Sequence, residues 1–176
     1  MSTINLANIK LIVGLGNPGP KFSRTRHNIG AMTIERLQDV GTQNIEPFQS
    51  PPTLLIPTTF MNESGREVAL HAKKSGIKPE EILVLHDDID LEPGNWKYKA
   101  GGSAGGHNGL RSIIASLGSD QFARLRIGVG RPFPHKPMTP EEENAIAKYV
   151  LSPIPSADQI KIDQSIDEIV ALLSGK

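Results

Sequence analysis

Short apolar runs alternate with segments of helical periodicity along most of the chain. The apolar runs are rich in branched side chains, as buried strands are, and they cover 9–15, 53–56, 82–85 and 125–129. Apolar positions at helical spacing predict helices from about 28 to 40 and over 64–75, 110–117, 141–150 and 157–173. Residues 95–99 alternate like a further short strand. This order predicts an α/β fold, with a mixed, mostly parallel twisted sheet and helices on both faces.

Length and composition agree with one domain. At 176 residues the chain can bury a sizeable core, and it shows neither an internal repeat nor a domain boundary, so a single domain over 1–176 is predicted. The 19 basic and 19 acidic residues give no net charge, which argues against polyanion binding over the whole surface but allows a local basic patch. The absence of cysteine excludes disulfides, thiolate nucleophiles and cysteine-based zinc sites.

The sequence contains no segment typical of a membrane protein. Its longest apolar run is too short to span a bilayer, and its first residues lack the charged and apolar regions of a signal peptide. We therefore expect no membrane contact and a cytoplasmic location, with an organelle as the alternative. No helix shows an unpaired apolar seam, which favours a monomer.

Small polar and imidazole side chains stand beside glycine, proline or methionine where apolar runs end. Five segments share this pattern: Gly16–Gly19, Arg26–Asn28, Phe60–Asn62, His86–Asp88 and Gly105–Asn108. In parallel sheets, binding sites gather at the carboxyl ends of the strands. Asparagines, histidines and a carboxylate at these ends make a poor core and a good polar pocket. The sequence therefore predicts an acid–base site with amide donors.

His27 and Asp87 form the candidate acid–base pair. His27 lies in a polar stretch between a predicted strand and a predicted helix, and Asp87 ends another strand. A carboxylate beside a histidine fixes its tautomer and raises its basicity, as a base that activates water requires. Spacing alone does not decide among His27, His86 and His107 as the partner of Asp87. The segment from His86 to Asp88 matches no metal-ligand pattern, so no metal is expected.

Three glycines of the first turn support a competing interpretation. Gly14, Gly16 and Gly19 satisfy the dinucleotide-binding pattern G-x-G-x-x-G after a strand. However, two prolines stiffen this loop, and the helix begins too late for its amino end to hold a pyrophosphate. Asp39, at the distance expected of a ribose partner, falls at a helix end and not after a second strand. A tight turn that projects Asn17 is therefore favoured over dinucleotide binding.

A glycine-rich loop at 101–106 lies between basic segments. It lacks the Gly-Lys-Ser/Thr ending of a P-loop, so triphosphate binding is not supported and close backbone approach to a ligand is favoured. Asn108, just after the loop, is either a helix cap or a ligand contact. Basic residues alternate on both sides of the loop and would suit phosphate groups: Lys97, Lys99, Arg124 and Arg126.

Five motifs follow one another in order between residues 9 and 130. They are Val13-Gly-Leu-Gly-Asn-Pro-Gly, Thr25-Arg-His-Asn-Ile-Gly, Pro57-Thr-Thr-Phe-Met-Asn-Glu-Ser-Gly, His86-Asp-Asp-Ile-Asp and Gly101-Gly-Ser-Ala-Gly-Gly-His-Asn-Gly-Leu-Arg-Ser-Ile. In this combination they resemble the bacterial-type peptidyl-tRNA hydrolase family. That resemblance implies an enzyme that cleaves the ester between a peptide and the terminal ribose of tRNA, with peptidyl-tRNA as its partner and with no metal or cofactor.

The resemblance also implies a role for each matching position. His27 matches the base that activates water, and Asp87 matches the carboxylate that orients this base. The amides that position the ester and the peptide and help to stabilise the oxyanion match Asn17, Asn62 and Asn108. Two further residues that line the substrate site match Met61 and His107. Positions implicated in gripping the acceptor end of tRNA and its phosphates match Lys97, Lys99 and Arg126.

Two departures from the family concern substrate binding. Phe22 stands at a substrate-binding position where the family commonly has a tyrosine, so a hydroxyl contact is missing. The stretch from 37 to 53 is shorter than usual and omits a strand or hairpin. An esterase acting on peptidyl-tRNA is the leading hypothesis. An RNA-binding module on the same scaffold is the alternative, and it is disfavoured because all the catalytic positions are retained.

Overall fold

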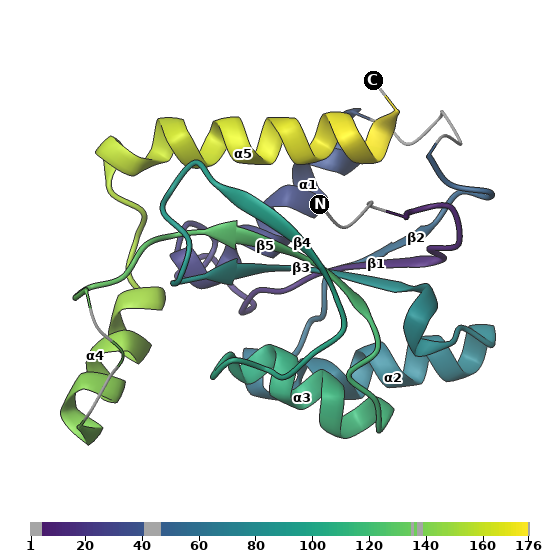
Figure 1. Cartoon of the computed structure of the whole chain (residues 1–176), viewed down its shortest axis with the longest axis horizontal. Helices are drawn as coiled ribbons and strands as arrows, with labels where there is room; N and C mark the ends of the chain where they lie inside the picture. Colours follow the sequence, from purple (N-terminus) through teal and green to yellow (C-terminus); the bar gives the residue numbers. More distant parts are fainter. Residues whose placement is uncertain (1–4, 41–46, 135, 137–138, 176) are drawn as a thin grey trace.

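The computed structural model describes residues 5–40, 47–134, 136 and 139–175, and it contains a five-stranded sheet between two layers of helices (Figure 1). The strands lie in the order β2-β1-β3-β5-β4. Their bounds are Leu11–Gly14 for β1, Thr53–Leu55 for β2, Ile82–Asp88 for β3, Trp96–Ala100 for β4 and Ala123–Gly128 for β5. β4 runs antiparallel to β5, and the other pairings are parallel. The predicted mixed, mostly parallel sheet is confirmed.

Helices cover both faces of the sheet, as predicted. On one face lie α1 (Ile29–Val40) and α5 (Ser156–Ser174), and on the other α2 (Ser64–Ser75) and α3 (Asn108–Leu117) (Figure 1). The remaining helix, α4 (Pro140–Val150), lies beyond the end of the sheet. Within the part of the chain that the structure describes, no helix is long and apolar enough to cross a bilayer.

Each layer of helices buries its own apolar cluster against the sheet. Alternate side chains of β3 contribute to the two clusters: Leu83 and Leu85 pack on the side of α1 and α5, and Ile82 and Val84 on the side of α2 and α3. Full burial of each such side chain contributes about 1.5–3 kcal/mol. Because both faces are covered, the strand forms a continuous apolar run in the sequence, which is why the pattern revealed it.

A close approach at Gly30 brings α1 against the carboxyl ends of β1 and β3. A Cβ atom on Gly30 would lie 2.1 Å from the carbonyl oxygen of Leu85, and one on Gly14 would lie 2.4 Å from the carbonyl oxygen of Gly30. No side chain fits at either position. Gly14, the first glycine of the dinucleotide-like pattern, is therefore explained by helix–sheet packing. The same packing holds the residues just before α1 at the edge of the sheet.

Several regular elements begin or end beyond the bounds that the apolar pattern predicts, whereas β1 and β2 are shorter than predicted. β3 continues through His86 to Asp88 because its backbone pairs with residues 126–128 of β5, whatever the side chains are. β5 begins at Ala123 instead of Leu125, and α3 begins at Asn108 instead of Leu110. The polar residues at these ends are thus held by strand and helix backbone. Of the shortened stretch from 37 to 53, residues 41–46 lie outside the described residues.

Candidate active site

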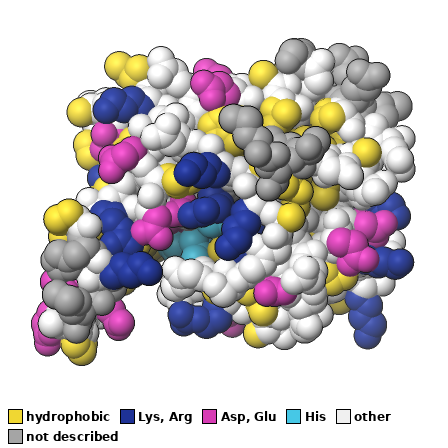
Figure 2. Space-filling model, viewed as in Figure 1, with side chains coloured by type: hydrophobic (Ala, Val, Ile, Leu, Met, Phe, Trp, Pro, Cys, Tyr) yellow, Lys and Arg dark blue, Asp and Glu magenta, His cyan; other side chains and the backbone are white. Residues whose placement is uncertain are grey.

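One carboxylate joins side chains from three separate elements at the carboxyl edge of the sheet. His27 lies in a 3₁₀ turn, η1 (Arg26–Asn28), that leads into α1, Asp87 lies in β3, and His107 precedes α3. The Oδ1 atom of Asp87 is 2.8 Å from Nδ1 of His27 and 2.9 Å from Nε2 of His107. Figure 2 shows histidine side chains at the floor of a hollow, with Lys and Arg side chains around it.

Asp87 is ionised inside this cluster. The residue is 3% exposed, and burial by itself would raise the pKa of its carboxyl group. The charges and hydrogen bonds of His27 and His107 outweigh burial and hold the pKa of Asp87 well below its usual range. The sequence left three histidines as rivals for this carboxylate. Two of them, His27 and His107, share it, and His86 does not.

Backbone N–H groups at the amino end of α3 determine which ring nitrogen of His107 carries the proton. Nδ1 of His107 accepts from the backbone N–H groups of Gly109, at 3.1 Å, and Leu110, at 3.4 Å. A neutral imidazole that accepts at Nδ1 carries its proton on Nε2, so His107 donates Nε2–H to Asp87. His107 is thus the N-cap of α3, and both of its ring nitrogens are engaged.

One ring nitrogen of His27 remains available to accept a proton. Its Nδ1–H donates to Asp87, which leaves the lone pair on Nε2. Desolvation of the buried ring lowers the pKa of His27, but the charge of Asp87 and the hydrogen bond to it more than offset this effect. The net result is a pKa raised above the ordinary value of 6.5. A carboxylate-oriented imidazole of this kind can accept a proton from water near neutral pH.

The same side chains offer metal-ligating atoms that lie within 4.8 Å of one another: His27, Asp87 and His107. A metal ion on Nε2 of His107 would require the proton to move to Nδ1, where it would face two backbone N–H donors. The donor set therefore fits a hydrogen-bonded cluster better than a metal centre.

His86 supports the backbone at the cluster without joining it. Its Nδ1–H donates to the carbonyl oxygen of Asp87 at 2.7 Å, and its ring meets that of His107 edge to face at 5.1 Å. Burial is the main cause that lowers the pKa of His86 to about 3. The ring is therefore neutral at physiological pH. Among the described residues, none accepts from or donates to its Nε2 atom.

Asn17 is held rigidly beside the cluster. Its Oδ1 accepts from the backbone N–H of Met61 at 2.8 Å, and its own backbone is bonded in both directions by the amide of Asn28. Met61 is buried, and a Cβ atom on Gly109 would lie 2.5 Å from its sulfur. Asn28 is a site residue to which the sequence analysis gave no role. Its position directly after His27, in a polar segment before a helix, was the available signal.

Asn62 and Asn108 lie at the rim of the site, outside the buried cluster. Both are exposed. Oδ1 of Asn108 accepts from the Arg111 guanidinium at 3.2 Å, and the described part of the chain supplies no hydrogen-bond partner to the Asn62 side chain. Because His107 occupies the N-cap position of α3, the interpretation of Asn108 as the helix cap is wrong. Its role as a ligand contact stays a prediction.

The basic residues on β4 and β5 divide into two kinds. Lys97 and Lys99 are exposed on β4, opposite Arg126 and Arg124 of β5. Arg126 is half-buried and its Nε donates to Asp88 at 2.6 Å. Arg124 is 2% exposed, and its guanidinium donates to the carbonyl oxygens of residues 102 and 103. The interpretation of Arg124 as a phosphate ligand is therefore wrong: it fastens the glycine-rich loop to the sheet.

Phe22 lies near the turn that precedes α2. Its ring meets that of Phe60 edge to face, with centroids 6.3 Å apart, and Phe60 is 53% exposed. The structure thus gives Phe22 an aromatic partner in place of the hydroxyl contact that a tyrosine would make. Whether this aromatic pair meets substrate stays a prediction.

A buried His–Asp pair with amides beside it, at the carboxyl edge of an α/β sheet, is suited to an enzyme that activates water for hydrolysis. The family model described as peptidyl-tRNA hydrolase matches residues 11–175. The chain therefore belongs to the peptidyl-tRNA hydrolase family, as its motifs suggested.

Similar proteins cover nearly the whole chain. The peptidyl-tRNA hydrolase of Shewanella denitrificans is 45% identical over 94% of this chain and 88% of its own length. That of Psychromonas ingrahamii is 47% identical over 91% of this chain and 84% of its own length. A crystal structure of the Acinetobacter baumannii peptidyl-tRNA hydrolase superposes with a TM-score of 0.79 at 36% identity, covering 99% of this chain and 92% of that one.

Proposed function

We propose that this enzyme hydrolyses the ester bond between peptide and tRNA in peptidyl-tRNA, with His27 as the general base. The observation that carries the proposal is the pairing of Nδ1 of His27 with a buried, ionised Asp87, 2.8 Å away. Family membership supplies the substrate, and the pair supplies the chemistry. No residue of the proposed site provides a thiol, since the chain has no cysteine.

In the proposed reaction, Nε2 of His27 takes a proton from a water molecule, whose oxygen attacks the ester carbonyl carbon. The tetrahedral intermediate carries its negative charge on the former carbonyl oxygen. When the ester C–O bond breaks, the ribose oxygen leaves and receives the proton from His27. General-base catalysis and amide donors to the oxyanion contribute about two or more powers of ten each.

The residues around the pair have distinct proposed roles in binding. Exposed amides at the rim, Asn62 and Asn108, suit a substrate whose peptide varies, because they can bind the common backbone and ignore side chains. Asn17 would help to place the ester from its fixed position next to Met61. The basic side chains Lys97, Lys99 and Arg126 would hold phosphates of the acceptor end.

A hydrolysis assay on N-blocked aminoacyl-tRNA tests the proposal. We expect turnover that persists after treatment with a chelator, because the base is a side chain and not a metal-bound hydroxide. Binding of the RNA without release of the blocked amino acid would contradict the proposal and favour an RNA-binding module. Activity lost on chelation and restored by a divalent ion would contradict the metal-independent mechanism. Gel filtration tests the accompanying proposal of a monomer.

A further inference from the structure

Arg26, the residue before His27, is buried in an unusual way. It is 5% exposed, and the described residues supply it with no acidic partner. One nitrogen of its guanidinium, Nη1, instead shares its hydrogens among Oγ of Ser152 at 2.6 Å and the carbonyl oxygens of Pro153 at 3.0 Å and Tyr149 at 3.4 Å. Burying a cation is costly unless its donors find acceptors, so the three neutral oxygens around Nη1 hold this end of the side chain in place.

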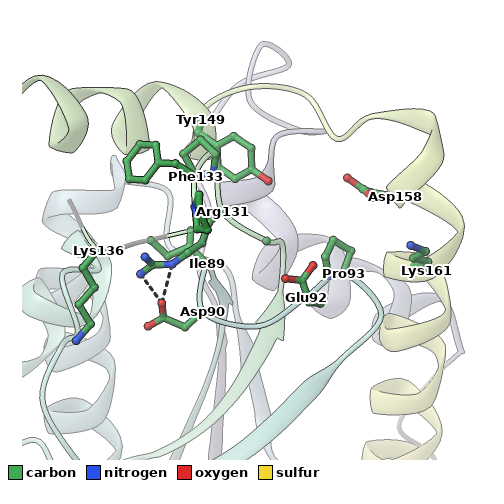
Figure 3. Close-up of a pocket in the computed structure, with 13 residues that line it drawn as sticks. Ile89, Asp90, Glu92, Pro93, Arg131, Phe133, Lys136, Tyr149, Asp158 and Lys161 are labelled. Atoms are coloured by element: carbon green, nitrogen blue, oxygen red, sulfur yellow. Dashed lines mark hydrogen bonds and ion pairs between the residues drawn. The ribbon is translucent and has the colours of Figure 1, made fainter.

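The ring of Tyr149, near the end of α4, stacks against the same guanidinium. The Arg26 Cζ atom lies 3.9 Å from the centre of the Tyr149 ring, within the range of a cation–π contact. The Tyr149 hydroxyl donates to the carbonyl oxygen of Val129, just beyond β5, at 2.8 Å. Tyr149 also lines a cavity of about 1060 Å³, where Figure 3 shows it beside Phe133 and above Arg131.

Backbone hydrogen bonds extend this contact along both segments. The N–H of Arg26 donates to the carbonyl oxygen of Ser152 at 3.3 Å, and the N–H of Ile154 donates to that of Arg24 at 3.2 Å. Thr25 and Pro153 form an isolated antiparallel bridge between these bonds. The η1 turn is therefore tied to residues 152–154 on one side of His27. On the other side of His27, Asn28 ties it to the first turn.

We propose that Arg26 is a positioning residue for His27. By fixing the η1 turn against Tyr149 and residues 152–154, it keeps Nδ1 of His27 on Asp87. The inference rests on the proposed role of His27 as the base. Lysine would not replace Arg26, because it lacks the planar guanidinium that stacks on the Tyr149 ring while its Nη1 atom donates to the acceptors around it. Tyr149 contributes through its ring, and its hydroxyl contributes less.

Kinetics of four variants test the positioning role. We expect Arg26→Lys to lower kcat by roughly ten- to a hundredfold, because a small misplacement of a catalytic group has effects of this size. The KM for tRNA substrate should change by less than about twofold, since Arg26 is buried away from solvent. Tyr149→Leu should resemble Arg26→Lys, and Tyr149→Phe, which keeps the ring, should stay close to the wild type. Arg36→Lys, a change of an exposed arginine on α1, is the matched control.

Two readouts separate positioning from simple loss of structure. When His27 drifts from Asp87, the raised pKa of His27 falls, so the acid limb of kcat in Arg26→Lys should move to lower pH. The downfield proton resonance of His27 Nδ1–H should weaken or shift in the same variant. This resonance needs no turnover, so it tests the positioning of His27 even if the proposed reaction fails.

Three results would overturn the inference. In the first, kcat and the pH profile of Arg26→Lys match those of the control. In the second, the loss of activity equals the loss of folded protein measured by circular dichroism, with an unmoved acid limb. In the third, Tyr149→Phe is as impaired as Tyr149→Leu, which would assign the effect to the hydroxyl bond at Val129 and not to the contact with Arg26.

Discussion

The floor and the rim of the site are built on different principles. At the floor, His27 and Asp87 are buried and His107 is partly buried, and each is fixed by at least one hydrogen bond from a different element. At the rim, Asn62 and Lys97 are exposed, and their side chains point to solvent. The difference indicates that the groups proposed for chemistry are preorganised, whereas Asn62 and Lys97, proposed for recognition, are exposed and accessible to substrate.

Physical chemistry favours this division. A base and its orienting carboxylate work best when no reorganisation is needed at the moment of reaction, which requires a low-dielectric, fully bonded setting. Phosphate and peptide contacts must form and break in every turnover, and exposed side chains allow this. Changes at the floor should therefore lower kcat most strongly, while changes at the rim should affect substrate binding or the rate without loss of stability.

The largest effect is expected from removal of the base. His27→Ala should lower kcat by about a thousandfold, within the range of general-base catalysis, while tRNA binding and thermal stability change little. Single-turnover hydrolysis and a filter-binding assay measure the two quantities. His71→Ala, a change of a partly exposed histidine on α2, is the matched control. A His27→Ala enzyme near the wild-type rate would remove His27 from the mechanism.

The orienting carboxylate is expected to give the next largest effect and a change in pH dependence. Neutral His27 is the active form, so the wild-type rate should rise with pH through a pKa above 6.5 and then level off. Asp87→Asn removes the charge that raises this pKa and leaves burial, which lowers it. The acid limb should therefore move to lower pH, and the plateau should fall about a hundredfold. An unmoved limb in kcat/KM against pH would contradict the pairing.

The amides sharpen the comparison between floor and rim. Asn62→Ala should lower kcat roughly tenfold with an unchanged melting temperature, because its side chain is exposed and contributes only when substrate is bound. Asn17→Ala should also destabilise the fold by about 1–3 kcal/mol, because the buried N–H of Met61 loses its acceptor. Thermal unfolding of both variants measures this difference in stability. Equal melting temperatures would argue against a fixed Asn17.

The smallest effect is expected on the basic side of the rim. Lys97→Ala should raise the KM for tRNA substrate by a few-fold at unchanged kcat. It should also reduce the slope of log affinity against log salt by about 1, the value for one phosphate contact. Lys74→Ala, on α2, is the control for the loss of one surface charge. A salt dependence identical to that of the wild type would mean that Lys97 meets no phosphate.

Much of the fold could be predicted because local pattern and tertiary environment agree. Strand β3 is apolar on both sides since helices cover both faces of the sheet, and that burial is visible as a run of apolar residues. The extension of β3 to Asp88 escaped prediction because a strand ladder joins backbone groups and leaves no trace in side-chain polarity. The burial of Arg124 could not be predicted for a related reason. Nothing in an alternating Arg-Leu-Arg segment shows which guanidinium turns inward.

The sequence by itself determined the order of the elements, the chemical groups available at their ends and, through its motifs, the family. Only the tertiary structure decided how the histidines divide their roles. The amino end of α3 fixes the proton of His107 on Nε2, so the free ring nitrogen beside Asp87 belongs to His27. That outcome depends on hydrogen bonds between residues far apart in the chain. Spacing along the sequence carries no information about such bonds, because their geometry exists only after the sheet and the helices have packed.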